Sequence, residues 1–261
     1  MLDPSGLDCA ALEALAGHGR AIVAARAALE AAAGGLLGAA TGGAATLEDW
    51  RHYPDGDVHD AVSHAQYFYH AHAPELGGAL PPTGAEHGHF HTFMRQGGLS
   101  PGVHPLVMPE LAIAGNPAAP SEAAPSAPAP AGDPDEAWTH LVAIALDDRG
   151  RPLRLFTTNR WVTGETWYAA ADVAAASARF AIGPGRVASP LDRWITALIG
   201  FYRPLIGRLL AERDAAVMGF RFRRRGKVHV LEDRRLEIAS EAPLDIDGDL
   251  RRVEAALCRI A

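Results

Sequence analysis

The chain has 261 residues, of which 48% are hydrophobic and 21% charged, and its formal net charge is -7. This length and composition predict a globular protein with a sizeable core, and the negative charge argues against a general nucleic-acid binder or a membrane-surface protein. Cys9 and Cys258 match no metal or redox spacing, no stretch approaches the ~20 apolar residues of a membrane span, and no basic region precedes an apolar run at the N-terminus. We therefore expect a cytoplasmic, bacterial-type protein in which residues 1–261 form a single domain.

The N-terminal part, residues 1–45, is predicted to be helical. Alanine dominates residues 7–39, and its high helix propensity favours one or two helices. The stretch Gly17-His18-Gly19 predicts a break in this segment, and Gly34-Gly35 predicts its end.

The next segment, residues 50–104, is rich in aromatic residues and histidine. The stretches "AQYFYHAH" and "HGHFHTFM" have the composition and alternation of strands, and the Gly/Pro-rich loop between them is long enough to return the chain antiparallel. Residues 57–66 are predicted to be helical, which would place Asp60 and His64 at i and i+4 on one face.

The second half of the chain combines predicted strands and helices. The Pro/Ala/Ser tract at 117–134 cannot bury a core and predicts a disordered insertion within the domain. A hairpin follows, with strands over 141–146 and 153–157. A long helix near 190–214 starts at "SPLD" and should bend at Pro204, residues 220–233 favour a second, basic hairpin, and residues 245–260 favour an amphipathic helix. The fold class is therefore α+β, with a mainly antiparallel sheet.

Histidines are concentrated in one part of the chain. Nine of the 12 lie between His52 and His104, where an even spread would place two or three. On a strand, residues i and i+2 share a face. His70 and His72 should therefore point the same way, and so should His87, His89 and His91. If the two strands pair, five imidazoles converge on a histidine-rich sheet face.

Such a cluster predicts a metal centre. Imidazole is the most common metal ligand, and two or three histidines with one carboxylate suit Zn²⁺ or Fe²⁺ with an open position for water or a small-molecule substrate. The candidate metal ligands are His70, His72, His89, His91, Asp60 and His64. The candidate catalytic groups are His87, as a proton shuttle or further ligand, and the carboxylates Glu86 and Glu165.

Two alternatives to a metalloenzyme remain open. The stretch "HGHFHTF" resembles the His-x-His-x-His signature of the histidine-triad nucleotide hydrolases and transferases. This resemblance covers about eight residues and implies that His89 is a nucleophile that needs no metal. Gly88 and Thr92, however, replace expected apolar positions of that signature. The other alternative is a non-catalytic metal-binding or sensing protein, in which protein groups fill every coordination position.

The stretch "LFTTNRWVTGETW" at 155–167 places polar side chains between two tryptophans. One interpretation is an exposed hairpin end, in which Gly164 adopts a positive φ. The other is a substrate pocket, in which Trp161 and Trp167 form walls while Asn159 and Glu165 orient a ligand.

A broader resemblance covers roughly residues 50–170. The stretches "HYPDGDV", "SHAQYFYHAH", "EHGHFHTF", "HLVAIALDDRG" and "LFTTNRWVTGETW", in this order, resemble an uncharacterised bacterial family described only as a domain of unknown function. The resemblance implies that the histidine-rich segment and the tryptophan stretch belong to one domain, with the Pro/Ala tract as an insertion. It implies no activity.

Overall fold

The computed structural model describes residues 2–32, 34–44, 47–48, 51–71, 86–106, 137–224 and 229–260. Their centre is a six-stranded antiparallel sheet in which each strand pairs with the next one along the chain, in the order β1-β2-β3-β4-β5-β6. The strands are β1 (Tyr53–His59), β2 (Ala65–Ala71), β3 (Glu86–Arg95), β4 (Trp138–Asp147), β5 (Pro152–Thr158) and β6 (Ile238–Pro243). This confirms the predicted α+β class, the pairing of the two histidine-bearing strands and the hairpin that follows them.

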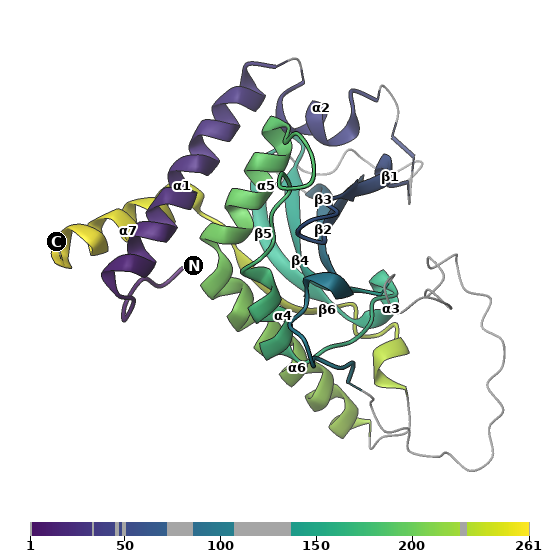
Figure 1. The fold of residues 1–261 in the computed structure, drawn as a ribbon. Coiled ribbons are helices and arrows are strands. Elements are labelled where there is room, and N and C mark those ends of the chain that lie inside the picture. The colour runs from purple at the N-terminus through teal and green to yellow at the C-terminus, as the bar shows by residue number, and fades with distance from the viewer. Residues whose placement is uncertain are drawn as a thin grey trace, which may run out of the picture.

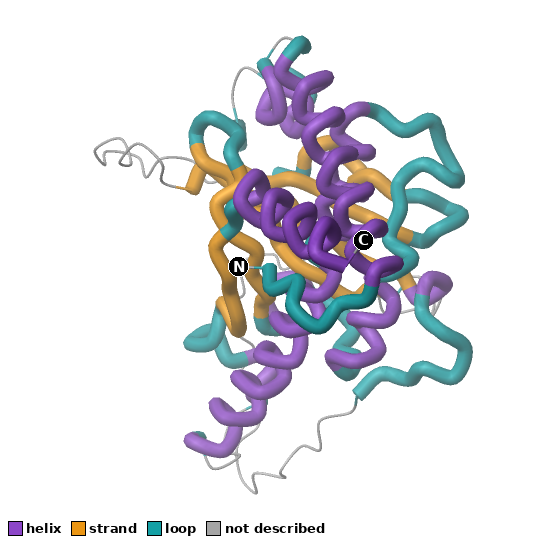
Figure 2. The backbone as a smooth tube through the Cα atoms, turned by 90° about the vertical axis from the view of Figure 1, so that its left-hand side faces the viewer, coloured by secondary structure: helices purple, strands orange, loops and turns teal. Residues whose placement is uncertain are grey.

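Helices cover one face of the sheet (Figure 1). The described residues form the helices α1 (Cys9–Glu30), α2 (Gly35–Thr41), α3 (Arg160–Thr163), α4 (Ala170–Ser177), α5 (Pro190–Phe201), α6 (Arg203–Arg223) and α7 (Ile246–Ile260), with short 3-10 turns at Gln96–Gly98 and Val230–Glu232. Helices α4, α5 and α6 lie on the covered face. Helix α1 packs against α5 and α7 on the outside of this layer, while α6 packs against α4 and β6. In Figure 2 the helices lie in front of the strands. The core therefore lies between the helices and one face of the sheet, and the histidines that pair across β2 and β3 lie on the other face.

The residues that cap the start of α5 also connect this helix to the sheet. The Ser189 side chain accepts a hydrogen bond from the Asp192 amide (3.1 Å), and the Asp192 carboxylate accepts one from the Ser189 amide (2.8 Å), which completes the predicted cap. The same carboxylate accepts a hydrogen bond from the Tyr67 hydroxyl (2.7 Å), so α5 is tied to β2. The predicted bend occurs at Tyr202, where α5 ends and Pro204 lies in the first turn of α6.

Three local predictions were wrong. The glycines near residue 18 do not break α1: a Cβ at Gly19 would lie 2.5 Å from Leu250 of α7, so this glycine allows close helix packing. Residues 57–66 contain the end of β1, a turn and the start of β2. The basic residues Arg221 and Arg223 extend α6 instead of forming a hairpin, and residues 225–228 are outside the described part.

No single helix formed by the described residues is both long enough and apolar enough to cross a bilayer. Among the described helices, one pair meets these criteria together: α1 and α2, which are bent by 83° relative to each other. The predicted insertion at 117–134 lies outside the described residues. The predicted N-terminal helical segment contains α1 and α2.

Candidate metal centre

Three histidines meet on the face of the sheet that points away from the helices. In the antiparallel pairing of β2 and β3, His70 is opposite His89, and Phe68 is opposite His91. Directly opposed residues share a face, so these four side chains form one surface, which we call the histidine face. Tyr67, Tyr69 and Phe90 alternate with them and point into the core, where Phe90 contacts Trp194 of α5.

The three imidazoles are close enough to share one ion. Each of His70, His89 and His91 offers a ring nitrogen, and these three atoms lie within 4.8 Å of one another. The Nε2 atoms of His89 and His91 are 3.0 Å apart. His89 and His91 are 6% and 2% exposed, whereas His70 is half-buried and is the most exposed of the three.

A glycine fixes how closely the two strands approach beside the trio. A Cβ at Gly88 would lie 2.4 Å from the carbonyl oxygen of His70 and 2.8 Å from the Cα of Ala71. Both atoms belong to backbone, which cannot move aside without shifting β2. The glycine of "HGHFH" therefore allows the register that brings His70 opposite His89.

Each of the two buried histidines is oriented by a further group. The Glu86 carboxylate lies 2.6 Å from Nδ1 of His89, and its second oxygen accepts a hydrogen bond from Arg154 (2.8 Å). On the other side, Nδ1 of His91 is hydrogen-bonded to Nε2 of His140 (3.1 Å). These contacts occupy the Nδ1 atoms and leave Nε2 of His89 and of His91 facing each other.

Burial keeps two of these imidazoles neutral. Desolvation, together with the neighbouring His89 and His140, lowers the pKa of His91 well below its ordinary value. Burial and the positive charge of Arg213 lower the pKa of His140 to about 3. A neutral imidazole is the form that binds metal ions.

Aromatic side chains surround the trio. The ring of His52 stacks on Phe68 with centroids 3.6 Å apart, and Phe93 contacts both His91 and His140. Sequence reasoning missed His52 and His140 as parts of the site. His140 directly precedes the predicted strand 141–146, which is a signal that it could belong to the sheet. Its distance along the chain from the other histidines gave no indication that it lies next to them.

One other histidine predicted for the site, His87, lies away from the trio. His87 contacts the Tyr69 hydroxyl through Nδ1 (2.8 Å), on the core side of β2. Strict alternation would place it beside His89, but the pairing of β3 with β4 is irregular between Glu86 and Gly88. His72 lies outside the described residues.

The predicted i, i+4 pair of Asp60 and His64 is also not part of the centre. The Asp60 carboxylate accepts hydrogen bonds from the amides of Val62, Ser63, Gly183 and Gly185 at 2.8 to 3.0 Å, so it fixes the β1–β2 turn. Burial raises its pKa, but the four amide donors together hold the pKa of Asp60 well below its usual range. His64 has a left-handed backbone conformation (φ 62) and packs against Gly97.

The residues of the tryptophan stretch have structural contacts. Asn159 caps α3 and donates to the carbonyl of Val230, and Trp161 donates to the carbonyl of Leu236. Trp167 is buried under the guanidinium of Arg213, with 4.0 Å between the guanidinium carbon and the ring centroid. The stretch is the end of β5 followed by α3, and Asn159, Glu165 and Trp167 are buried, so it is not an exposed hairpin end. Gly164 has the predicted positive φ (64).

Glu165 binds the part of β4 that lies beside the trio. One carboxylate oxygen accepts hydrogen bonds from the His140 amide (2.8 Å) and the Thr139 hydroxyl (3.0 Å), while its other oxygen has no hydrogen-bond partner among the described residues. Burial raises the pKa of Glu165 to about 7, against the lowering effect of Arg213 and these donors. Glu165 thus holds the strand segment that carries His140.

Taken together, these observations define an α+β protein whose six-stranded antiparallel sheet carries a three-histidine cluster able to hold a metal ion. The chain belongs to the family named Domain of unknown function (DUF6969), whose model matches residues 16–244. This confirms the resemblance to an uncharacterised domain family and extends it beyond residues 50–170. No curated protein and no solved structure matches the chain.

Proposed function

We propose that His70, His89 and His91 bind a divalent transition metal, with Zn²⁺ or Fe²⁺ as the leading candidates, and that this centre acts on a small-molecule substrate. The observation that carries the proposal is the convergence of three ring nitrogens within 4.8 Å on one face of a sheet. Imidazole suits both ions.

The distances support a shared ion. With metal–nitrogen bonds of about 2.0 to 2.1 Å, neighbouring ligand atoms lie about 2.9 Å apart in octahedral and about 3.4 Å apart in tetrahedral coordination. The 3.0 Å separation of Nε2 of His89 from Nε2 of His91 falls in that range. A hydrogen bond between the two rings has the same length, so only a metal measurement distinguishes the two arrangements.

The outer contacts support the same assignment. Histidines that bind metals commonly donate their other ring N–H to a carboxylate or another acceptor, which fixes the tautomer and the ring orientation. Glu86 has this relation to His89, and the neutral His140 has it to His91. Because both Glu86 oxygens are occupied, by His89 and Arg154, Glu86 acts as a positioning residue and not as the general base.

Three protein ligands leave room for a water molecule or a substrate. A divalent ion in such a centre supplies Lewis acidity and lowers the pKa of a bound water. The protein's own groups hold the three nitrogens in place, exclude water behind His91 and leave the half-buried side of His70 as the approach. Phe68 and Phe93 make the wall next to the trio apolar, which favours a small substrate with an apolar part.

Elemental analysis of the purified protein tests the proposal. We expect close to one equivalent of a transition metal in the wild type, and its loss in His89→Ala and His70→Ala. His104→Ala is the matched control, because His104 is exposed and lies outside the trio. Full metal content in His89→Ala would refute the site.

Two other outcomes identify the alternatives. Metal-free protein that hydrolyses nucleoside phosphoramidates would favour the histidine-triad chemistry with His89 as nucleophile. A bound metal without exchangeable water, measured by solvent proton relaxation of the Mn²⁺- or Co²⁺-loaded protein, would favour storage or sensing over catalysis.

A further inference from the structure

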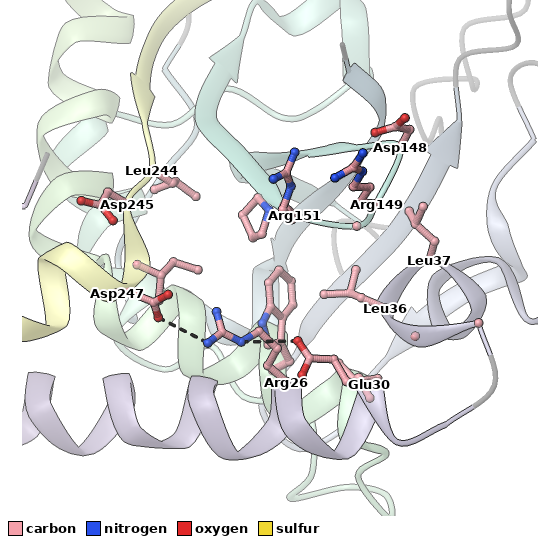
Figure 3. A pocket seen from close by; sticks show the side chains of 17 residues that line it. Arg26, Glu30, Leu36, Leu37, Asp148, Arg149, Arg151, Leu244, Asp245 and Asp247 are labelled. Carbon is pink, nitrogen blue, oxygen red and sulfur yellow. Dashed lines mark hydrogen bonds and ion pairs between the residues drawn. The ribbon is translucent and has the colours of Figure 1, made fainter. Parts of the chain in front are cut away.

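A cavity of about 550 Å³ lies beside the β4–β5 turn (Figure 3). Its walls come from the end of α1, the start of α2, the β4–β5 turn and the link between β6 and α7. This volume is within the range of pockets that hold small molecules. None of the histidine-face residues lines it.

The floor of the cavity is apolar. It includes Leu29 and Trp194, which are 2% and 1% exposed, together with Leu36, Leu37 and Leu244. These side chains come from α1, α5, α2 and the end of β6, so elements far apart in sequence form one continuous apolar surface. Such a floor fits an aliphatic or aromatic side chain of a ligand.

One wall is basic. Arg149 and Arg151, on the β4–β5 turn, are among the residues that line the cavity (Figure 3). Nε of Arg151 donates a hydrogen bond to the buried Asp147 carboxylate (2.7 Å), which holds the guanidinium group in position. Among the described residues, no ion pair engages the side chain of Arg149. Two guanidinium groups on one wall are suited to a carboxylate.

The opposite wall is acidic. Asp247, in the first turn of α7, and Glu30, at the end of α1, line the cavity beside one cation, Arg26, whereas the Asp245 carboxylate accepts a hydrogen bond from the Gly248 amide (3.0 Å) and caps α7. Arg26 lies 3.4 Å from Asp247 and 3.8 Å from Glu30, so a single guanidinium is shared by two carboxylates at long range. The two carboxylates beside one guanidinium therefore leave negative charge for a ligand cation.

From this separation of charge we infer that the cavity binds a zwitterionic small molecule with an apolar side chain, of the amino-acid or dipeptide class. The carboxylate of the ligand lies toward Arg149 and Arg151, its ammonium group toward Asp247 and Glu30, and its side chain on the leucine and tryptophan floor. A bare metal ion fits less well, since the histidine trio is the one group of metal-ligand geometry found among the described residues.

Isothermal titration calorimetry on the full chain tests this inference with four probes: L-leucine, L-leucyl-L-leucine, 4-methylpentanoate, which lacks the amine, and 3-methylbutylamine, which lacks the carboxylate. We expect L-leucine or the dipeptide to bind at least about tenfold more tightly than either single-charge probe. The tighter of the two zwitterions identifies the size of the ligand. Equal binding of 4-methylpentanoate, or no binding of either zwitterion up to about 10 mM, would overturn the inference.

Variants separate this site from the metal centre. Arg149→Ala and Asp247→Asn each change an exposed side chain and should weaken zwitterion binding at least about fivefold. Arg251→Ala, which removes an exposed arginine of α7 outside the cavity, is the control and should leave binding unchanged. His89→Ala should lose the metal and keep zwitterion binding, whereas unchanged binding in both Arg149→Ala and Asp247→Asn would refute the assignment.

Discussion

Replacing Glu165 with glutamine should change how stability depends on pH. Burial raises the pKa of Glu165 from an ordinary 4.5 to about 7 in the folded protein. Between these two values the unfolded chain has lost the proton and the folded chain has kept it, so ionisation favours unfolding as the pH rises. One pKa unit corresponds to about 1.4 kcal/mol, so this carboxyl lowers the free energy of unfolding by about 3 kcal/mol between pH 4.5 and pH 8.

The Glu165→Gln variant removes this term and keeps the shape of the side chain. Its amide oxygen can accept from Thr139 and from the His140 amide, as the carboxylate does. We expect the variant to match the wild type near pH 4.5 and to exceed its stability by about 3 kcal/mol near pH 8.

Urea denaturation followed by tryptophan fluorescence, repeated across this pH range, measures the difference. Comparing the two proteins at each pH cancels the titration of all other groups. Glu212→Gln, on the exposed side of α6, is the control and should show no such trend. A constant difference between wild type and Glu165→Gln at every pH would refute the reasoning.

Three further predictions concern the histidine face and its support. Asp60→Asn should lower the free energy of unfolding by about 3 kcal/mol at pH 7, measured by urea denaturation, because an amide cannot accept from all four backbone donors. Since the folded pKa of Asp60 is depressed, this loss should shrink as the pH falls below about 4, where the unfolded aspartate is protonated. Glu86→Gln should weaken metal binding by about 10- to 100-fold in a chelator competition, while the fold, monitored by circular dichroism, is retained. Gly88→Ala should cost about 2 kcal/mol or more in thermal or urea unfolding, because the added Cβ would meet the backbone of β2.

The elements that the sequence predicts well are those whose signals are local. Alternation in "AQYFYHAH" and "HGHFHTFM" predicts strands because side chains on a strand repeat every two residues. The serine, proline and aspartate at 189–192 predict a helix start because each acts within one turn. The antiparallel return of β3 on β2 follows from the length of the loop between them.

The errors arise where distant residues decide the local conformation. Asp60 and His64 have helical spacing, but the amides of Gly183 and Gly185, more than 120 residues away, engage the aspartate and stabilise a turn. Gly19 suggests a helix break from the sequence alone, but in the fold Leu250 of α7 packs where a side chain at Gly19 would lie. His140 joins the site only through the pairing of β3 with β4, which places Phe93 opposite it.

The histidine face itself depends on strand register. A shift of β2 by one residue against β3 would turn His70 into the core and bring Tyr69 out, because neighbouring residues on a strand point to opposite faces. The core favours the observed register, since Tyr67 reaches Asp192 of α5 and Tyr69 and Phe90 pack together with centroids 4.9 Å apart. The contacts that stabilise the helix-covered side of the sheet therefore also hold the three imidazoles together on the other side. A motif of alternating histidines is not sufficient for such a centre: His87 belongs to the same row in the sequence, but one irregular pair in the sheet directs it to Tyr69.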